Sequence, residues 1–172
     1  MKKIVLALAL VILCLSVNAQ KMNNDNKKIT VIEDRIAIKN LVDTFSVLAD
    51  VKDVKTQLLL FTENAEVSSV TNGKPGGTLT GRKQIGEAFA GFLNLFDVVY
   101  HINGQQTVTL NGNKASGISY CQVVLIGTEN NKKMKTTMGV IYHDDYVKEN
   151  GHWLINKRQS NFTWTEKTEM KP

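Results

Sequence analysis

The chain has little cysteine, and this limits how it can be stabilised. Two of its 172 residues are cysteines. Cys14 lies in an N-terminal stretch that we expect to be cleaved off, so that Cys121 alone remains. A disulfide within the mature chain is therefore excluded, and packing must hold the fold together. Cys121 lies in an apolar run and is interpreted as a small buried hydrophobic residue, with a reactive thiol as the alternative.

Patterns that hold metals, phosphates or nucleic acids are also missing. The three histidines, His101, His143 and His152, do not have a metal-binding spacing. Segment 73–81 contains Pro75 and lacks the Gly-Lys-Ser/Thr arrangement of a phosphate loop. The formal charge of +5 is not gathered into a basic stripe with interleaved aromatics. We therefore expect no metal, no cofactor and no nucleic-acid partner.

The N-terminus has the pattern of an export signal. Met1-Lys2-Lys3 is basic, residues 4–17 are almost continuously apolar, and Val17-Asn18-Ala19 provides small residues for cleavage. This predicts a signal peptide over residues 1–19, a periplasmic or extracellular protein, and no membrane association after cleavage. Anchoring as a lipoprotein through Cys14 is the weaker alternative, because a leucine precedes that cysteine.

The remaining chain, about 150 residues long, is enough for one domain. Residues 20–29 are polar and predict a disordered leader. Apolar residues recur at helical spacing over residues 33–49, and Asp53 is a natural N-cap for a short second helix. A short strand, a glycine-rich loop and a third helix are then predicted. These lie at residues 65–70, 72–77 and 81–96.

The second half of the chain has the alternation of β-strands. Turn residues such as Asn150-Gly151 separate its apolar runs. The predicted strands span residues 98–110, 115–128, 135–148 and 152–165. Helices followed by a four-stranded antiparallel meander predict an α+β domain over residues 30–166, with residues 167–172 as a tail. Helices covering one face of a curved sheet leave a cavity, where we expect the functional site.

The residues from Ile32 to Trp164 carry a family resemblance. In order they include Asp34-Arg35-Ile36-Ala37-Ile38, Asp50 with Asp53, Gly81-Arg82, His101, Tyr142-His143-Asp144 and Gly151-His152-Trp153. The chain resembles the SnoaL-like group of the nuclear transport factor 2-like superfamily, which includes ketosteroid isomerases and scytalone dehydratase. The resemblance implies a cone-shaped fold, with N-terminal helices packed on a curved antiparallel sheet, and a homodimer through that sheet.

The resemblance also implies an acid–base pair in the cone. The carboxylate position falls on Asp50 and the histidine position on His101, and tyrosines of the family orient the substrate. Tyr120 and Tyr142 are the candidates for that role, and Phe45 is a third predicted substrate-binding residue. Phe45 stands five residues before the carboxylate, where the family's steroid dehydratases often have a tyrosine, and a phenyl ring can only pack.

The residues themselves leave alternatives open. A carboxylate such as Asp50 is disfavoured at a helix end, and Asp53 already provides the next cap. Asp50 shares a helical face with Asp43 and Ser46, so that a solvated polar face is an alternative to a pocket residue. Alternation places His101 and Asn103 on one face of a strand, and a plain hydrogen-bonded or exposed histidine is the alternative to a catalytic one.

Positions on the long strands can face either the cavity or the outside. Tyr120, Gln122, Met138, Tyr142 and Arg158 are such positions, and parity cannot be fixed from the sequence. We expect a protein that binds a small apolar or amphipathic molecule, as a cofactor-free dehydratase or isomerase. The alternative is a non-catalytic ligand-binding or dimerisation module.

Overall fold

The structure is a computed structural model that describes residues 2–171, with side-chain surroundings given for Gln20, Met22 and residues 25–171. The chain divides into two compact units, residues 1–36 and residues 37–172. The predicted signal peptide, residues 1–19, lies outside the residues whose side chains are described. Within the described part of the chain, no helix is both long and apolar enough to cross a membrane.

The first helix, α1, spans Lys2–Asp50 and is longer than the sequence predicts. It includes residues 20–29, which the sequence predicts to be a disordered leader. The 49 residues of α1 include neither proline nor glycine, so that no strong helix breaker interrupts it. Beyond residue 36, the side of α1 that carries Ile38, Val42 and Phe45 is buried.

The end of α1 is fixed by backbone hydrogen bonds. The Lys52 N–H donates to the Ala49 carbonyl at 3.0 Å, and the Asp53 N–H donates to the Leu48 carbonyl at 2.9 Å. Lys52 has a left-handed φ of 58°, as the residue after a helix end often does. Asp53 then accepts a hydrogen bond from the Thr56 N–H and caps α2, Val54–Gln57, as the sequence predicts. Asp50 is thus the last residue of α1 and has no capping role.

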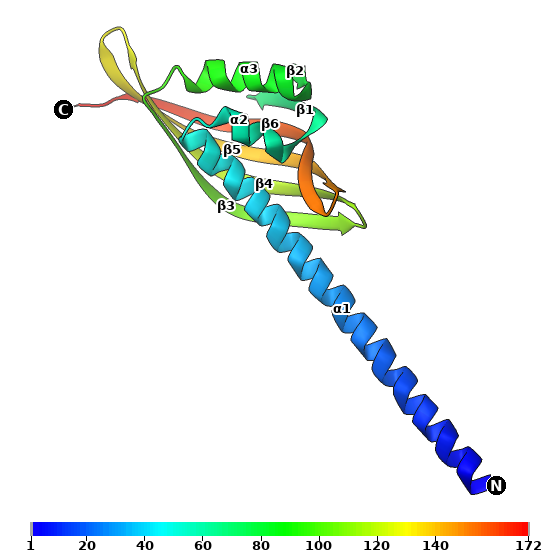
Figure 1. The fold of residues 1–172 in the computed structure, drawn as a ribbon. Coiled ribbons are helices and arrows are strands. Elements are labelled where there is room, and N and C mark those ends of the chain that lie inside the picture. Colours follow the sequence, from blue (N-terminus) through cyan, green and yellow to red (C-terminus); the bar gives the residue numbers. More distant parts are fainter. Residues whose placement is uncertain (1, 172) are drawn as a thin grey trace. The chain divides into compact units, whose positions relative to one another are not determined.

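A six-stranded mixed sheet forms the rest of the fold. After the short helix η1, Leu58–Leu60, the elements are β1 Phe61–Thr71, β2 Lys74–Thr80, α3 Gly81–Leu93, β3 Val98–Asn111, β4 Lys114–Glu129, β5 Lys132–Glu149 and β6 His152–Glu169. The strand order is β2-β1-β6-β5-β4-β3 (Figure 1). The α+β prediction and the four-strand meander are confirmed.

Two features of the sheet differ from the prediction. The sheet is mixed, because β1 pairs with β6 in parallel, whereas all other pairs are antiparallel. The segment predicted as a loop, residues 72–77, is largely the edge strand β2, in which Pro75 lies opposite Val70. An edge strand tolerates proline because one side of its backbone needs no partner strand.

The core lies between the helices and one face of the sheet. One cluster joins Phe45 of α1 to Phe61 of β1, Ile85 of α3 and Tyr146 of β5. A second cluster combines apolar residues of β3, β4 and β5 with Ala49 and with Leu93 at the end of α3. Helices therefore cover part of the inner face of the sheet, as Figure 1 shows for α2 and α3.

The outer face of the sheet carries exposed aromatic and aliphatic side chains. Tyr100 and Ile102 of β3, Tyr120 of β4 and Trp164 of β6 are each about half exposed. Trp164 lies over Gly139, where an added Cβ would come within 2.0 Å of the indole nitrogen. The absence of a side chain at residue 139 therefore lets the indole lie flat on β5.

Candidate active site

A cavity of about 360 Å³ lies between the helices and the inner face of the sheet. Residues from all three helices and all six strands line it, and most of these residues are apolar. Its larger polar side chains are Gln57, His101, Tyr142 and Arg158. An apolar pocket with a few convergent polar groups is the usual form of a small-molecule site.

Asp50 and His101 form a hydrogen-bonded pair at this cavity. His101 Nδ1 lies 2.6 Å from Asp50 Oδ1, although 51 residues separate the two in the sequence. The His101 side chain is 8% exposed and the Asp50 side chain is 23% exposed. His101 lines the cavity, whereas Asp50 is not among the lining residues. The fold therefore brings together the carboxylate and the histidine that the resemblance implies.

The surroundings of His101 determine its protonation. Burial lowers the pKa of the imidazole, and this effect exceeds the opposite effect of the Asp50 carboxylate. The ring is therefore neutral at pH 7, with Nδ1–H donating to Asp50 and a lone pair on Nε2. A neutral histidine held in this tautomer can accept a proton from a molecule in the cavity.

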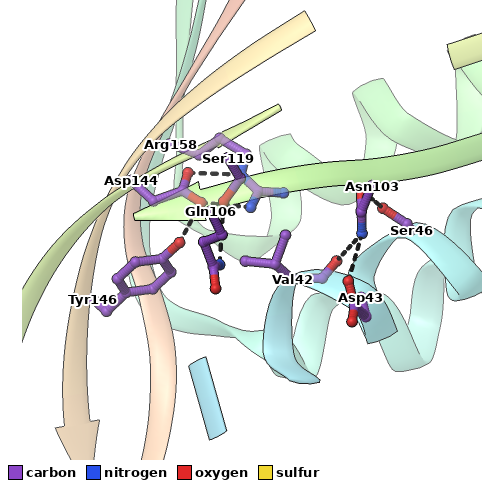
Figure 2. Close-up of polar contacts among 9 residues, drawn as sticks. All are labelled: Val42, Asp43, Ser46, Asn103, Gln106, Ser119, Asp144, Tyr146 and Arg158. Atoms are coloured by element: carbon purple, nitrogen blue, oxygen red, sulfur yellow. Dashed lines mark hydrogen bonds and ion pairs between the residues drawn. The ribbon is translucent and has the colours of Figure 1, made fainter. Parts of the chain in front are cut away.

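Part of the polar face of α1 packs on β3. The Ser46 hydroxyl donates to Asn103 Oδ1 at 3.0 Å. Asn103 Nδ2 donates to Asp43 Oδ1 at 3.0 Å and to the Val42 carbonyl at 3.3 Å (Figure 2). Ser46 is buried at this contact, and Asp50 stays partly exposed while it contacts His101. The end of α1 and β3 are therefore joined beside the Asp50–His101 pair.

Arg158 contributes a charged group to the cavity wall. Its Nε and Nη2 donate to the two oxygens of Asp144 at 2.8 and 2.7 Å. The Tyr146 hydroxyl donates to the same carboxylate at 2.8 Å (Figure 2). The two charged side chains are 1% and 0% exposed. Burial disfavours the charged guanidinium, but Asp144 outweighs this effect and raises the pKa of Arg158.

The same arginine keeps one nitrogen free of Asp144. Its guanidinium lies against two rings, 4.2 Å from the Phe45 centroid and 4.3 Å from the Tyr142 centroid. Nη1 is buried and has no hydrogen-bond partner among the described residues. Because Arg158 lines the cavity, this nitrogen can donate to a molecule bound there. Arg158 was one of the strand positions whose direction the sequence could not fix.

The predicted substrate-binding residues divide between the two faces of the sheet. Phe45 and Tyr142 line the cavity, with their ring centroids 6.2 Å apart. Burial raises the pKa of Tyr142. Tyr120, in contrast, is 48% exposed on the outer face and does not reach the cavity. The alternation of β4 turns Cys121 inward and Tyr120 outward.

The remaining histidines and the cysteine have plainer surroundings. His143 and His152 are exposed. Cys121 is buried, and burial raises the pKa of its thiol to about 11, so that it is protonated and unreactive at neutral pH. No group of three or more metal-ligating side chains occurs in the part of the chain that the structure describes.

Sequence comparison identifies a family. The sequence model of the SnoaL-like domain matches residues 30–159. Among curated proteins, no sequence matches the chain.

Solved structures with the same fold are numerous. A candidate scytalone dehydratase from Novosphingobium aromaticivorans DSM 12444 has a TM-score of 0.71 and 22% identity, over 83% of this chain and 91% of that one. The hexachlorocyclohexane dehydrochlorinase LinA-type3 from Novosphingobium barchaimii LL02 has a TM-score of 0.66 and 16% identity, over 81% and 91% of the two chains. At these identities the likeness shows the fold alone.

Proposed function

Because the chain belongs to the family of SnoaL-like domains, we propose that it is a cofactor-free enzyme acting on a small, mostly apolar molecule. The reaction is a dehydration or an isomerisation that begins with removal of a proton from carbon, next to a carbonyl or hydroxyl group. Asp50 and His101 are the acid–base pair. The observation that carries the proposal is the 2.6 Å contact of His101 Nδ1 with Asp50, which leaves Nε2 for the cavity.

The geometry supports a mechanism in which three side chains share the work. His101 Nε2 accepts the proton from the substrate carbon, and Asp50 stabilises the imidazolium that forms. Arg158 Nη1 donates to the substrate oxygen on which negative charge develops. The imidazolium then returns the proton, either to a departing hydroxyl group, which leaves as water, or to a different carbon. The first outcome is a dehydration and the second an isomerisation.

The names of two structural neighbours support an elimination more than an isomerisation. A dehydratase removes water and a dehydrochlorinase removes hydrogen chloride, so that both names describe loss of a small group. Both reactions can start from a carbon-bound proton taken by a base. The neighbours contribute this analogy only, whereas the argument for proton transfer comes from the Asp50–His101 pair itself.

The experiment uses proton exchange, because it does not require the natural substrate. Acetophenone carrying a deuterated methyl group is incubated with the enzyme in water, and loss of deuterium is followed by mass spectrometry. We expect His101→Ala to slow the exchange by about 10²- to 10⁴-fold, the usual contribution of a positioned base. Asp50→Asn should slow it less, since the imidazole remains. His152→Ala is the matched control, because that histidine is exposed. Equal exchange by wild type, His101→Ala and Asp50→Asn would refute the proposal.

A second role is favoured by the outer face of the sheet. We propose that the protein forms a homodimer through the exposed side chains Tyr100, Ile102, Tyr120 and Trp164. Apolar side chains gathered on one exposed face often mark an interface. Light scattering after gel filtration should show a dimer for wild type and a monomer for Tyr120→Glu. A non-catalytic binding or dimerisation module would give the same dimer but no exchange activity.

Export remains a proposal from the sequence. The basic start, the apolar run and the small residues before Gln20 support cleavage after Ala19. The intact mass of the protein recovered from the periplasm or medium should correspond to a chain that begins at Gln20. Recovery of a full-length chain in the cytoplasm would contradict the proposal.

A further inference from the structure

Gln57 is a buried polar side chain whose acceptor atom is unused. It is the last residue of α2 and is 1% exposed. Its Nε2 donates to the Phe45 carbonyl at 3.0 Å, and this contact fixes which way the amide points. Oε1 is buried and has no hydrogen-bond partner among the described residues. Buried amide oxygens are nearly always satisfied, so that this one calls for a partner.

The two residues that carry the unused oxygen and the unused nitrogen belong to the wall of the same cavity. Gln57 and Arg158 both line the cavity. Both also contact Phe45. Gln57 donates a hydrogen bond to the Phe45 backbone carbonyl, and the Arg158 guanidinium lies over the Phe45 ring. In the described part of the chain, Gln57 Oε1 and Arg158 Nη1 are the two buried side-chain atoms without a partner. One is an acceptor and the other a donor, so that together they match a ligand with one donor and one acceptor.

The charges around the cavity disfavour an anionic ligand. Asp50 and Asp144 are negative, Arg158 is positive and His101 is neutral, which leaves a surplus of one negative charge. Asp144 already occupies Nε and Nη2 of the guanidinium, so that a ligand carboxylate could not form a two-pronged pair with it. A second uncompensated negative charge would be repelled strongly in surroundings of low polarity. An uncharged acceptor, such as a carbonyl oxygen, meets Nη1 without this penalty.

We propose that the substrate is an uncharged, mostly apolar molecule that carries a hydroxyl group in addition to its carbonyl, and that Gln57 selects it. The hydroxyl donates to Gln57 Oε1, and the carbonyl oxygen accepts from Arg158 Nη1. A cavity of about 360 Å³ has room for about twelve non-hydrogen atoms at ~30 Å³ each. This assignment rests on the proposed function only in treating the bound molecule as a substrate, because the two unused atoms require the same ligand in a carrier.

The test measures binding by isothermal titration calorimetry with the mature protein. The ligands are the three ring isomers of hydroxyacetophenone, their methyl ethers, acetophenone and carboxyacetophenone. For wild type, we expect at least one hydroxy isomer to bind about tenfold more tightly than its methyl ether, or about 1.4 kcal/mol. The carboxylate should bind more weakly than acetophenone.

Two variants assign the preference to Gln57. Gln57→Leu removes the acceptor, and Gln57→Met does so while keeping a long unbranched side chain, in case the leucine variant does not fold. In either variant, the hydroxy isomer and its methyl ether should bind with nearly equal affinity. Wild type that binds no hydroxyacetophenone, or that binds every isomer no better than its ether, would overturn the assignment. A preference that survives in Gln57→Met would do the same.

The proposed function can fail separately. His101→Ala should keep the preference for the hydroxyl group while losing deuterium exchange. Wild type that shows the preference but no exchange would refute the enzyme and leave the ligand class in place. Wild type that shows exchange but no preference for the hydroxyl group would support the enzyme and refute the ligand class.

Discussion

Two carboxylate pairs border the cavity, and they differ in burial and in the number of their bonds. Asp50 meets His101 through one hydrogen bond and is partly exposed. Asp144 meets Arg158 through two hydrogen bonds, takes a third from Tyr146, and is fully buried. The first pair contains a base whose pKa is lowered and that can take up a proton. The second holds a guanidinium whose pKa is raised and whose charge is permanent.

The difference shows how one cavity can place a group whose charge changes, His101, apart from a group whose charge is permanent, Arg158. Asp50, the last residue of α1, is partly exposed and contacts His101. The middle of β5 places Asp144 in the core, where its charge is tolerable only because Arg158 is present. A proton can therefore be moved on one side of the cavity while a constant donor stays on the other.

The largest effect should come from breaking the Asp144–Arg158 pair, called here the fixed pair. Asp144→Ala leaves the Arg158 guanidinium buried and uncompensated, and such a change costs about 3–5 kcal/mol in free energy of unfolding. Urea denaturation followed by circular dichroism measures it. Asp50→Ala, the matched change in the other pair, should cost roughly 1 kcal/mol or less, because that carboxylate is partly exposed.

A double variant distinguishes the loss of the Asp144–Arg158 hydrogen bonds from the cost of leaving the Arg158 charge buried without a partner. Asp144→Leu combined with Arg158→Met replaces the pair by apolar side chains and should recover much of the lost stability. If Asp144→Ala and Asp50→Ala cost the same, the distinction between the two pairs is wrong.

The pH dependence of activity should follow the first pair alone. His101 acts as a base when neutral, and its pKa lies below the usual 6.5 because burial outweighs Asp50. The rate constant kcat/KM for exchange should therefore fall on the acid side with a midpoint below 6.5. In Asp50→Asn the midpoint should move lower still, since the group that raises the pKa is gone.

The same shift gives a stability change of known sign. The unfolded chain binds a proton at His101 at higher pH than the folded chain does. The contribution to stability is therefore complete above about pH 6.5 and is lost as the pH falls towards the lowered pKa of the folded protein. His101→Ala should remove this part of the pH dependence. A midpoint for kcat/KM at or above 6.5 would mean that the effect of Asp50 on the pKa of His101 exceeds that of burial.

The sequence predicted those parts of the fold that local chemistry decides. Alternation and Asn-Gly turns located β3 to β6, and Asp53 was identified as a cap because its side chain can only serve the helix that follows. The edge strand β2 was missed, because Pro75 and its neighbouring glycines indicate a loop unless a partner strand is known. The parallel pairing of β1 with β6 was missed because it joins segments about ninety residues apart.

The sequence likewise indicated some residues of the candidate site and missed others. Family spacing indicated Asp50 and His101, and the structure places them in contact. Tyr120 and Tyr142 could not be told apart, because the face on which the helices pack decides which of them is buried. Gln57 was missed because nothing in a short helix followed by three leucines indicates that an amide would enter an apolar cavity. Only the fold reveals that its oxygen and the Arg158 nitrogen share a wall.

The smallest predicted effect concerns Asn103, which joins α1 to β3 beside the Asp50–His101 pair. Asn103 joins Ser46, Asp43 and the Val42 carbonyl, so that it holds the end of α1 against β3. Asn103→Ala should cost about 1 kcal/mol in free energy of unfolding, the net value of an ordinary hydrogen bond.

Asn103→Ala should affect catalysis only through the positions of Asp50 and His101. If Asn103 aligns the pair, the variant lowers kcat for exchange several-fold and leaves KM unchanged, because the cavity wall that binds the ligand is intact. The acid-side midpoint should then shift towards that of Asp50→Asn, since a looser contact with Asp50 raises the pKa of His101 less. A purely structural asparagine would lower the unfolding free energy and leave both kcat and the midpoint where they are in wild type. Because the hydrogen bonds of Asn103 go to α1 and those of Asp144 go to Arg158 and Tyr146, the Asp144–Arg158 pair should be unaffected in either case.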